Sequence, residues 1–191
     1  IEARYVMTYA ATEPPSNSST GLITVEMNSS MVLLPKEPMM QRLADQRVGW
    51  FSRSVVDFGL NEQKAASRRF LDRWRLEVKE EDYDIFRRGE LVEPKEPIVF
   101  YIDPATPKQW VPFLKQGVED WQAAFEEAGF KNAIIAKDAP TPEEDPTWSA
   151  EDARYSVIRY FASDIQNAYG PHVSDPRSGE IIESDIGWYH N

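Results

Sequence analysis

The feature that most constrains this chain is a continuous apolar run at residues 97–103, PIVFYID, followed by an amphipathic stretch and a second short apolar run. A continuous apolar run of this length suits a strand that is buried on both faces. The residues after it place apolar side chains three or four apart, which predicts a helix over 108–128. These side chains are Trp110, Leu114, Val118, Trp121, Phe125 and Ala128. With a strand at 132–136, NAIIA, they form a β-α-β unit, in which the two strands are expected to be parallel.

The remainder of the second half reads as further strands of the same sheet. RYSVIRYFAS (154–163) predicts a third strand, and the stretches 168–174 and 179–189 predict two more. The turn sequence DPRSG joins the last two.

The first part of the chain predicts antiparallel β-structure. The first nine residues alternate apolar and polar, as a half-buried strand does. A loop is expected at 13–21, then a hairpin in which LITVEM (22–27) and MVLLP (31–35) flank Asn28–Ser30. A short strand is expected within 52–58 and another over 73–79. The predicted class is α+β: a mixed, twisted sheet with one long helix, preceded by a smaller antiparallel β-rich part.

Charge and composition exclude several classes of function. The formal net charge is −11, which argues against nucleic acid as a partner because phosphate binding needs clustered Lys and Arg. No apolar run approaches the length of a membrane span. The absence of cysteine removes disulfides and thiolate metal sites. The start has neither Met nor a signal pattern, so we expect this chain to be a piece of a longer protein.

The residues suited to catalysis form no complete active site in the sequence. The two histidines, His172 and His190, are not in an H-E-x-x-H motif, and His172 with Asp175 would make only a weak metal pair. We therefore expect no catalytic residue and no bound metal in this chain. An acid–base hydrolase could use three carboxylates near the C-terminus, Glu180, Glu183 and Asp185, but a solvated strand face in an acidic protein is the favoured interpretation.

The tryptophans offer a separate possibility, a platform for a ligand. Five of them lie in apolar or alternating contexts and are expected in the core, namely Trp50, Trp74, Trp110, Trp121 and Trp188. Trp148 lies in an acidic, proline-rich stretch and is expected to be exposed.

Several motifs resemble the large bacterial zinc-dependent metalloproteases of the metzincin type. The resemblance is specific in YIDPATP, GVEDWQAAFEEAGF and DPRSGEI. It extends to RYVMTY and RRFLDRWRLE and is looser before about residue 45. It implies that residues 1–76 end a β-rich accessory domain and that the acidic segment 77–96 is a connector. Residues 97–191 would be the upper subdomain of the peptidase, which in that family immediately precedes the zinc-binding helix.

The resemblance also implies a substrate-binding strand. In this family an antiparallel edge strand, here 168–174, lies over the active-site cleft and pairs with an extended peptide. Its residues would be Ala168, Tyr169, Gly170, Pro171 and His172. Pro171 has no N–H, so one ladder bond would be missing there.

The activity implied is hydrolysis of peptide bonds by zinc-activated water in the full-length protein, with the zinc ligands and the glutamate base beyond Asn191. The expected partners are a peptide or protein substrate and the remainder of the catalytic domain. The expected location is secreted, periplasmic or at the bacterial cell surface. The alternative is a secreted, non-catalytic β-rich module that binds glycan or protein, for which Trp148 would be the contact residue.

Overall fold

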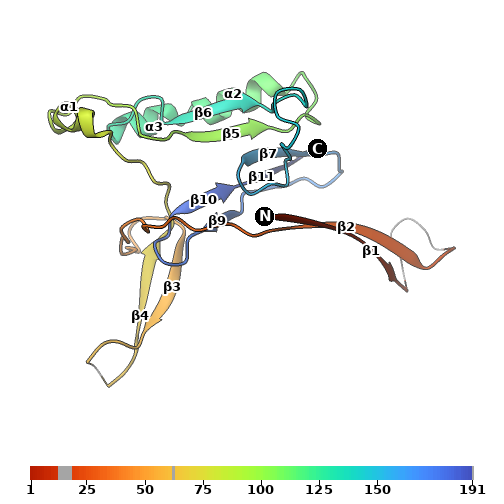
Figure 1. Cartoon of the computed structure of the whole chain (residues 1–191), viewed down its shortest axis with the longest axis horizontal. Helices are drawn as coiled ribbons and strands as arrows, with labels where there is room; N and C mark the ends of the chain where they lie inside the picture. The colour runs from red at the N-terminus through yellow and green to blue at the C-terminus, as the bar shows by residue number, and fades with distance from the viewer. Residues whose placement is uncertain (13–18, 62, 191) are drawn as a thin grey trace. The chain divides into compact units, whose positions relative to one another are not determined.

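The computed structural model describes residues 1–12, 19–61 and 63–190, and the protein is of the α+β class, with 13% of its residues helical and 36% in strands. Two compact units are present (Figure 1). One comprises Ile1–Leu33 with Glu151–Ala153, and the other Leu34–Ala150 with Arg154–Asn191. The domain boundaries expected at 76 and 96 concern the parent protein and stay a prediction. No helix in the described ranges is both long and apolar enough to cross a membrane.

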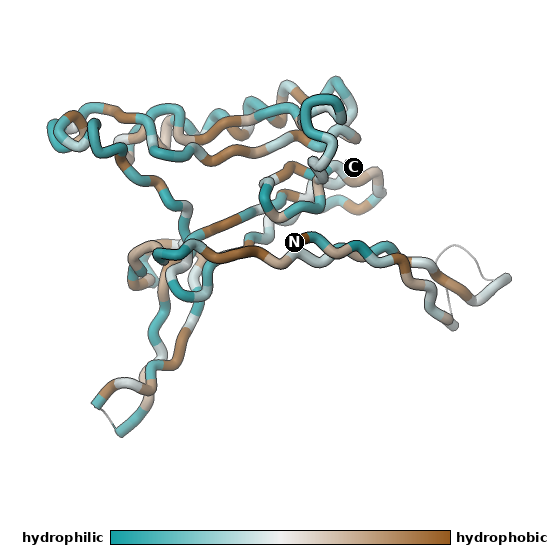
Figure 2. The backbone as a smooth tube through the Cα atoms, viewed as in Figure 1, coloured by the Kyte–Doolittle hydropathy of each residue, from teal (hydrophilic) through white to brown (hydrophobic). Residues whose placement is uncertain are grey.

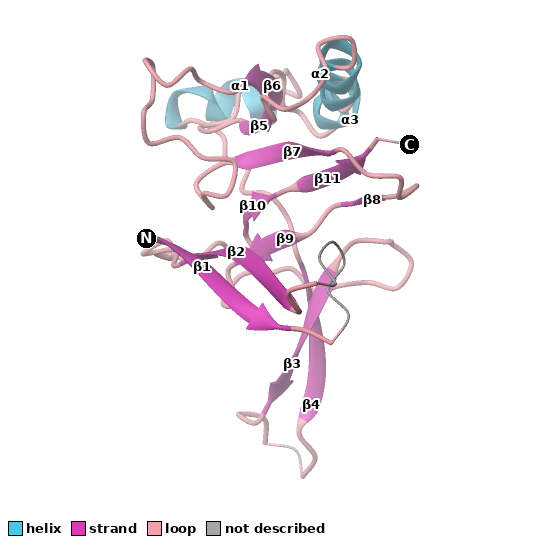
Figure 3. Cartoon of the chain, turned by 90° about the vertical axis from the view of Figure 1, so that its right-hand side faces the viewer, coloured by secondary structure: helices cyan, strands magenta, loops and turns pink. Residues whose placement is uncertain are grey.

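The larger unit is built on a five-stranded mixed sheet of order β6-β5-β7-β11-β8. Its strands are β5 (Ile98–Ile102), β6 (Ile134–Asp138), β7 (Ser156–Phe161), β8 (Ala168–Tyr169) and β11 (Ile186–Tyr189). β5 is parallel to both of its neighbours and β11 is parallel to β7, so the predicted parallel β-α-β unit is confirmed. Only β8 runs antiparallel, at the edge beside β11, as Figure 3 shows.

The expected single helix over 108–128 is two helices, α2 (Val111–Glu119) and α3 (Gln122–Glu127). They separate at Trp121. Its N–H donates to the carbonyl of Val118, three residues back, which is the 3₁₀ spacing instead of the four-residue spacing of an α-helix. The helix begins at Val111, and Pro112 lies in its first turn, where no N–H is needed. Both helices lie along β5 and β6 (Figure 1).

The core lies between these helices and the sheet. The buried side chains are Ile98, Phe100, Ile102, Val118, Ile134 and Ile158. Val157, on the opposite face of β7, is completely buried. A second cluster joins Val78 and Val92 to Phe130 and Ala133, so the acidic segment 77–96 is not solvated throughout. That segment contains a 3₁₀ turn, Glu80–Asp82, and the short helix α1 (Tyr83–Arg87).

The smaller unit is a two-stranded ribbon of β1 (Glu2–Ala10) and β2 (Leu22–Ser30). The hairpin expected around Asn28–Ser30 is wrong, because β2 continues to Ser30 and pairs along its whole length with β1. Met31–Leu34, coloured brown in Figure 2, follows β2 without forming a strand. The expectation of a half-buried first strand also fails, because no second layer covers the ribbon within its own unit. Of the expected loop at 13–21, residues 13–18 lie outside the described ranges.

Two further hairpins complete the larger unit. β3 (Ser52–Asp57), the short strand expected within 52–58, pairs with β4 (Ala66–Leu71). β9 (His172–Ser174) pairs with β10 (Ile181–Ser184) around the predicted turn. The strand expected over 73–79 is reduced to single bridges, Arg73 to Glu180 and Val78 to Pro94, because this segment contacts a different partner at each end.

Candidate functional site

The strongest candidate site is the edge strand β8. Ala168 pairs with Trp188 and Tyr169 with Gly187, and β8 is the last strand in the order of the sheet. Its outer edge has no partner strand among the described residues. Outward-facing N–H and C=O groups of such a strand are a template for pairing with another extended chain.

Tyr169 is positioned by a glycine. A Cβ at Gly187 would lie 2.3 Å from the Tyr169 ring. The ring therefore occupies the space that a side chain at position 187 would fill. The ring also stacks on Phe161 with centroids 6.2 Å apart and contacts Tyr189 at 6.0 Å. Tyr169 is nevertheless 46% exposed. The edge strand therefore presents an aromatic surface on the face of the sheet that carries Tyr169.

The expected edge strand over 168–174 is divided in two. Gly170 and Pro171 lie between β8 and β9, and the missing N–H of Pro171 ends the ladder there. The carbonyl of Pro171 accepts a bond from the Ser184 hydroxyl at 3.0 Å. Of the five residues expected to line the cleft, Ala168 and Tyr169 lie on the sheet edge, whereas His172 lies on β9 in a separate hairpin.

The two histidines lie in different surroundings. His172 Nε2 lies 3.1 Å from Asp72 Oδ2, and its ring packs on Phe51. Asp175 is completely buried, and Arg177 binds its carboxylate, holding the pKa of Asp175 below its usual range. His190 contacts aromatic rings of Trp110, Tyr160 and Trp188. Among the described residues no three potential ligands gather closely enough to hold an ion.

Of the three carboxylates proposed for acid–base catalysis, Glu180 lies apart from Glu183 and Asp185, which are neighbours. Glu180 is buried and makes two bonds with Arg75, at 2.8 and 2.6 Å. Asp185 accepts a bond from the Val157 N–H at 2.8 Å. Burial, and then the neighbouring Asp185, raise the pKa of Glu183 to about 7. None of the three carboxylates lines the cavity described next.

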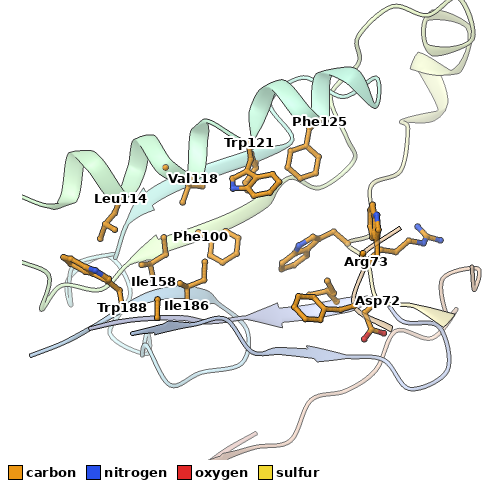
Figure 4. A pocket seen from close by; sticks show the side chains of 18 of the residues that line it. Asp72, Arg73, Phe100, Leu114, Val118, Trp121, Phe125, Ile158, Ile186 and Trp188 are labelled. Atoms are coloured by element: carbon orange, nitrogen blue, oxygen red, sulfur yellow. The ribbon is translucent and has the colours of Figure 1, made fainter. Parts of the chain in front are cut away.

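An apolar cavity of about 670 Å³ lies between the α2–α3 layer and the sheet, lined by the residues in Figure 4. Helix side chains Leu114, Val118, Trp121 and Phe125 form one wall, and Phe100, Ile158, Ile186 and Trp188 of the sheet form another. The residues 49–51 and 72–74 close one end, and Ala168 of β8 also contributes. The cavity therefore reaches from the core to the candidate edge strand.

The tryptophans are distributed differently from the expectation. Trp121 and Trp50 both line the cavity and are 62% and 54% exposed. Trp110 is likewise exposed. Trp148, expected to be exposed, is half-buried against the rings of Tyr101 and Tyr155. Trp74 and Trp188 pack in the partly buried surroundings expected of them.

Sequence reasoning missed a set of charged residues around the turn at 175–180, chiefly Arg53, Asp72 and Arg75. Their partners are 100 or more residues away along the chain. The only sequence signal was the density of charge in RRFLDRWRLE, which does not identify those partners.

Comparison with known proteins gives a family match for the first part of the chain. Residues 1–79 match a family described as a domain of unknown function, DUF5117. No curated protein and no solved structure matches the chain. The first part of the chain is therefore similar to a family whose function is not defined.

Proposed function

We propose that this chain is part of a zinc-dependent metallopeptidase of the metzincin type and that β8 binds its extended peptide substrate. The observation that carries the proposal is the antiparallel edge strand on an otherwise parallel sheet. The resemblance of the motifs led us to expect a mixed sheet, a helical layer after its first strand and an antiparallel edge strand. All three are present, at β5, α2–α3 and β8.

The edge strand suits recognition by strand addition. Main-chain bonds to a peptide give affinity that is independent of sequence, and side chains beside the strand give specificity. Residues paired across two strands point to the same face. A peptide residue opposite Tyr169 would contact the aromatic surface of Tyr169, Phe161 and Tyr189, and a residue opposite Ala168 would face the side of the apolar cavity.

In the described part of the chain no three possible metal ligands lie together, and the imidazole of His172 is bonded to Asp72 and the carboxylate of Asp175 to Arg177. We propose that the ligands belong to the remainder of the catalytic domain. The apolar cavity supports a contact with that remainder, because its exposed rim carries Trp50, Phe51, Phe113 and Trp121. An exposed apolar surface of this kind is typical of an interface.

The test is made on a protein that extends this chain with its downstream coding sequence. We expect it to hydrolyse casein, to lose that activity in a chelator and to recover it with zinc. The 191-residue chain alone is expected to be inactive. Activity that persists without metal would refute the proposal, as would a downstream sequence without H-E-x-x-H-x-x-G-x-x-H.

A binding module for glycan or protein is the second candidate, and the exposed aromatic rim of the cavity favours it. The contact residue would then be Trp121 instead of Trp148, which packs against Tyr101 and Tyr155. A ligand that the isolated chain binds and that Trp121→Ala abolishes would support this candidate. Loss of binding on Trp148→Ala alone would contradict the change of contact residue.

A further inference from the structure

The turn at 175–180 is held by residues 35–75, which belong to the segment similar to the family of unknown function. Backbone hydrogen bonds join the two segments where they lie side by side. The Arg73 N–H donates to the Gly179 carbonyl at 2.8 Å, and the Ile181 N–H donates to the Arg73 carbonyl at 2.9 Å. The approach is so close that a Cβ at Gly179 would lie 2.2 Å from the Leu71 carbonyl oxygen.

Charged side chains from the same segment bind both ends of the turn. Arg75 makes a two-bond ion pair with Glu180, which raises the pKa of the Arg75 guanidinium. Arg53 donates to the carbonyl of Asp175. These are the charge-assisted contacts that contribute most among hydrogen bonds.

Two further contacts tie the turn to residues nearer the start of this segment. Arg177 donates to the Pro35 carbonyl at 2.6 Å, and the Gln41 amide donates to the Arg177 carbonyl at 2.7 Å. Together with Arg53 and Arg75, these contacts bind the turn from four separate points in residues 35–75.

The same segment reaches toward the edge strand through His172. Asp72 bonds the imidazole of His172, and Phe51 packs on the ring. Only Gly170 and Pro171 separate His172 from Tyr169 of β8. The position of His172 therefore restricts where the end of β8 can lie.

We propose that residues 35–75 act as a clamp that positions β8 and β9, with Arg53, Asp72 and Arg75 as positioning residues. This inference rests on the proposed function only in assigning substrate binding to β8. The inference assigns a role to part of the segment that is similar to the family of unknown function. Residues 35–75 hold the candidate substrate strand in place from outside the sheet.

Hydrogen exchange on the 191-residue chain tests the clamp without a substrate. In Arg75→Ala, the amides of 172–181 should exchange faster by on the order of tenfold, the effect of losing a hydrogen bond to a charged group. Arg75→Lys keeps the charge but loses the two-bond geometry, so its effect should be intermediate. Should the alanine variant not fold, the lysine variant alone carries the test.

Lys115→Ala is the matched control. Lys115 pairs with Asp138 at 2.6 Å, the same distance as the shorter Arg75–Glu180 bond, and both cations are 29% exposed. This pair does not touch the turn, so exchange in 172–181 should stay unchanged. Unchanged exchange in the Arg75 variants, or an equal rise across β5, β6 and β7, would overturn the clamp.

A second measurement separates the clamp from the proposed function. A blocked peptide of alternating threonine and valine should protect the amides of 168–169 in the wild-type chain. Its affinity should fall in Arg75→Ala and stay unchanged in Lys115→Ala. A peptide that does not bind the wild-type chain would count against the proposed function, whereas the exchange rates alone decide the clamp.

Discussion

Replacing Gly179 by alanine should destabilise the chain far more than the same replacement at Gly89. The two glycines share a φ of +82°, so both substitutions meet the same left-handed backbone strain. A Cβ at Gly89 has nothing within 4 Å, whereas one at Gly179 would lie 2.2 Å from the Leu71 carbonyl oxygen. The difference between the two variants therefore isolates the close approach of the turn to residues 71–73.

The expected loss in the free energy of unfolding follows from the contacts that each substitution breaks. An alanine in the left-handed region costs roughly 1–2 kcal/mol, partly offset by the smaller conformational freedom of its unfolded state. We expect about 1 kcal/mol for Gly89→Ala. At Gly179 the turn must also move from Leu71, which breaks the two backbone bonds of Arg73. At about 1 kcal/mol for each bond, the total for Gly179→Ala is roughly 3 kcal/mol.

Urea unfolding followed by tryptophan fluorescence measures both variants, since the chain contains six tryptophans. The expected result is equal slopes and a free energy of unfolding about 2 kcal/mol lower for Gly179→Ala than for Gly89→Ala. Equal stability of the two variants would refute the reasoning, because it would mean that the turn does not press against residues 71–73.

Three other outcomes follow from the same structure. The raised pKa of Glu183 means that the folded state holds a proton that the unfolded state releases, so stability should fall as pH rises from about 4.5 to about 7. The full shift corresponds to roughly 3 kcal/mol of stability, which the half exposure of Glu183 reduces to about 1–2 kcal/mol. Glu183→Gln should flatten this pH dependence, as measured by urea titrations at several pH values. Gly187→Ala should displace the Tyr169 ring and lower the free energy of unfolding by about 1–3 kcal/mol. Adding Tyr169→Ala should remove much of the clash, so additive losses in the double variant would argue against the contact. Val157→Ala should cost about 2–3 kcal/mol by calorimetry because Val157 is completely buried, whereas Val56→Ala, at an exposed position, should cost under about 0.5 kcal/mol.

The sequence determined those elements whose pattern of apolar residues repeats within a short stretch. PIVFYID became a central strand because every second side chain, from Ile98 to Ile102, enters the core and the strand has a neighbour on each side. The spacing of apolar residues after it correctly predicted helix, and β6 and β7 lie within a few residues of the expected ranges. The expected strands over 168–174 and 179–189 are each divided in two, and β9 and β10 form a separate sheet.

The sequence did not determine where long apolar segments pair or end. Asn28–Ser30 suggested a turn, but the long register between β1 and β2 continues through it. The division of the helix at Trp121 and the exposure of Trp50 and Trp121 were likewise not predicted. Neither property is encoded within a short window.

For the candidate site, the family resemblance implied the edge strand, and the tertiary structure decided what surrounds it. The stretch from Ala168 was expected at an edge, and β8 lies there. That Tyr169 rests on Gly187, that His172 bonds Asp72 and that Arg75 holds Glu180 could not be read from the chain. These contacts join residues about 18 to 105 positions apart, and a hydrogen bond or a close contact depends on distance in space, which only the folded chain sets.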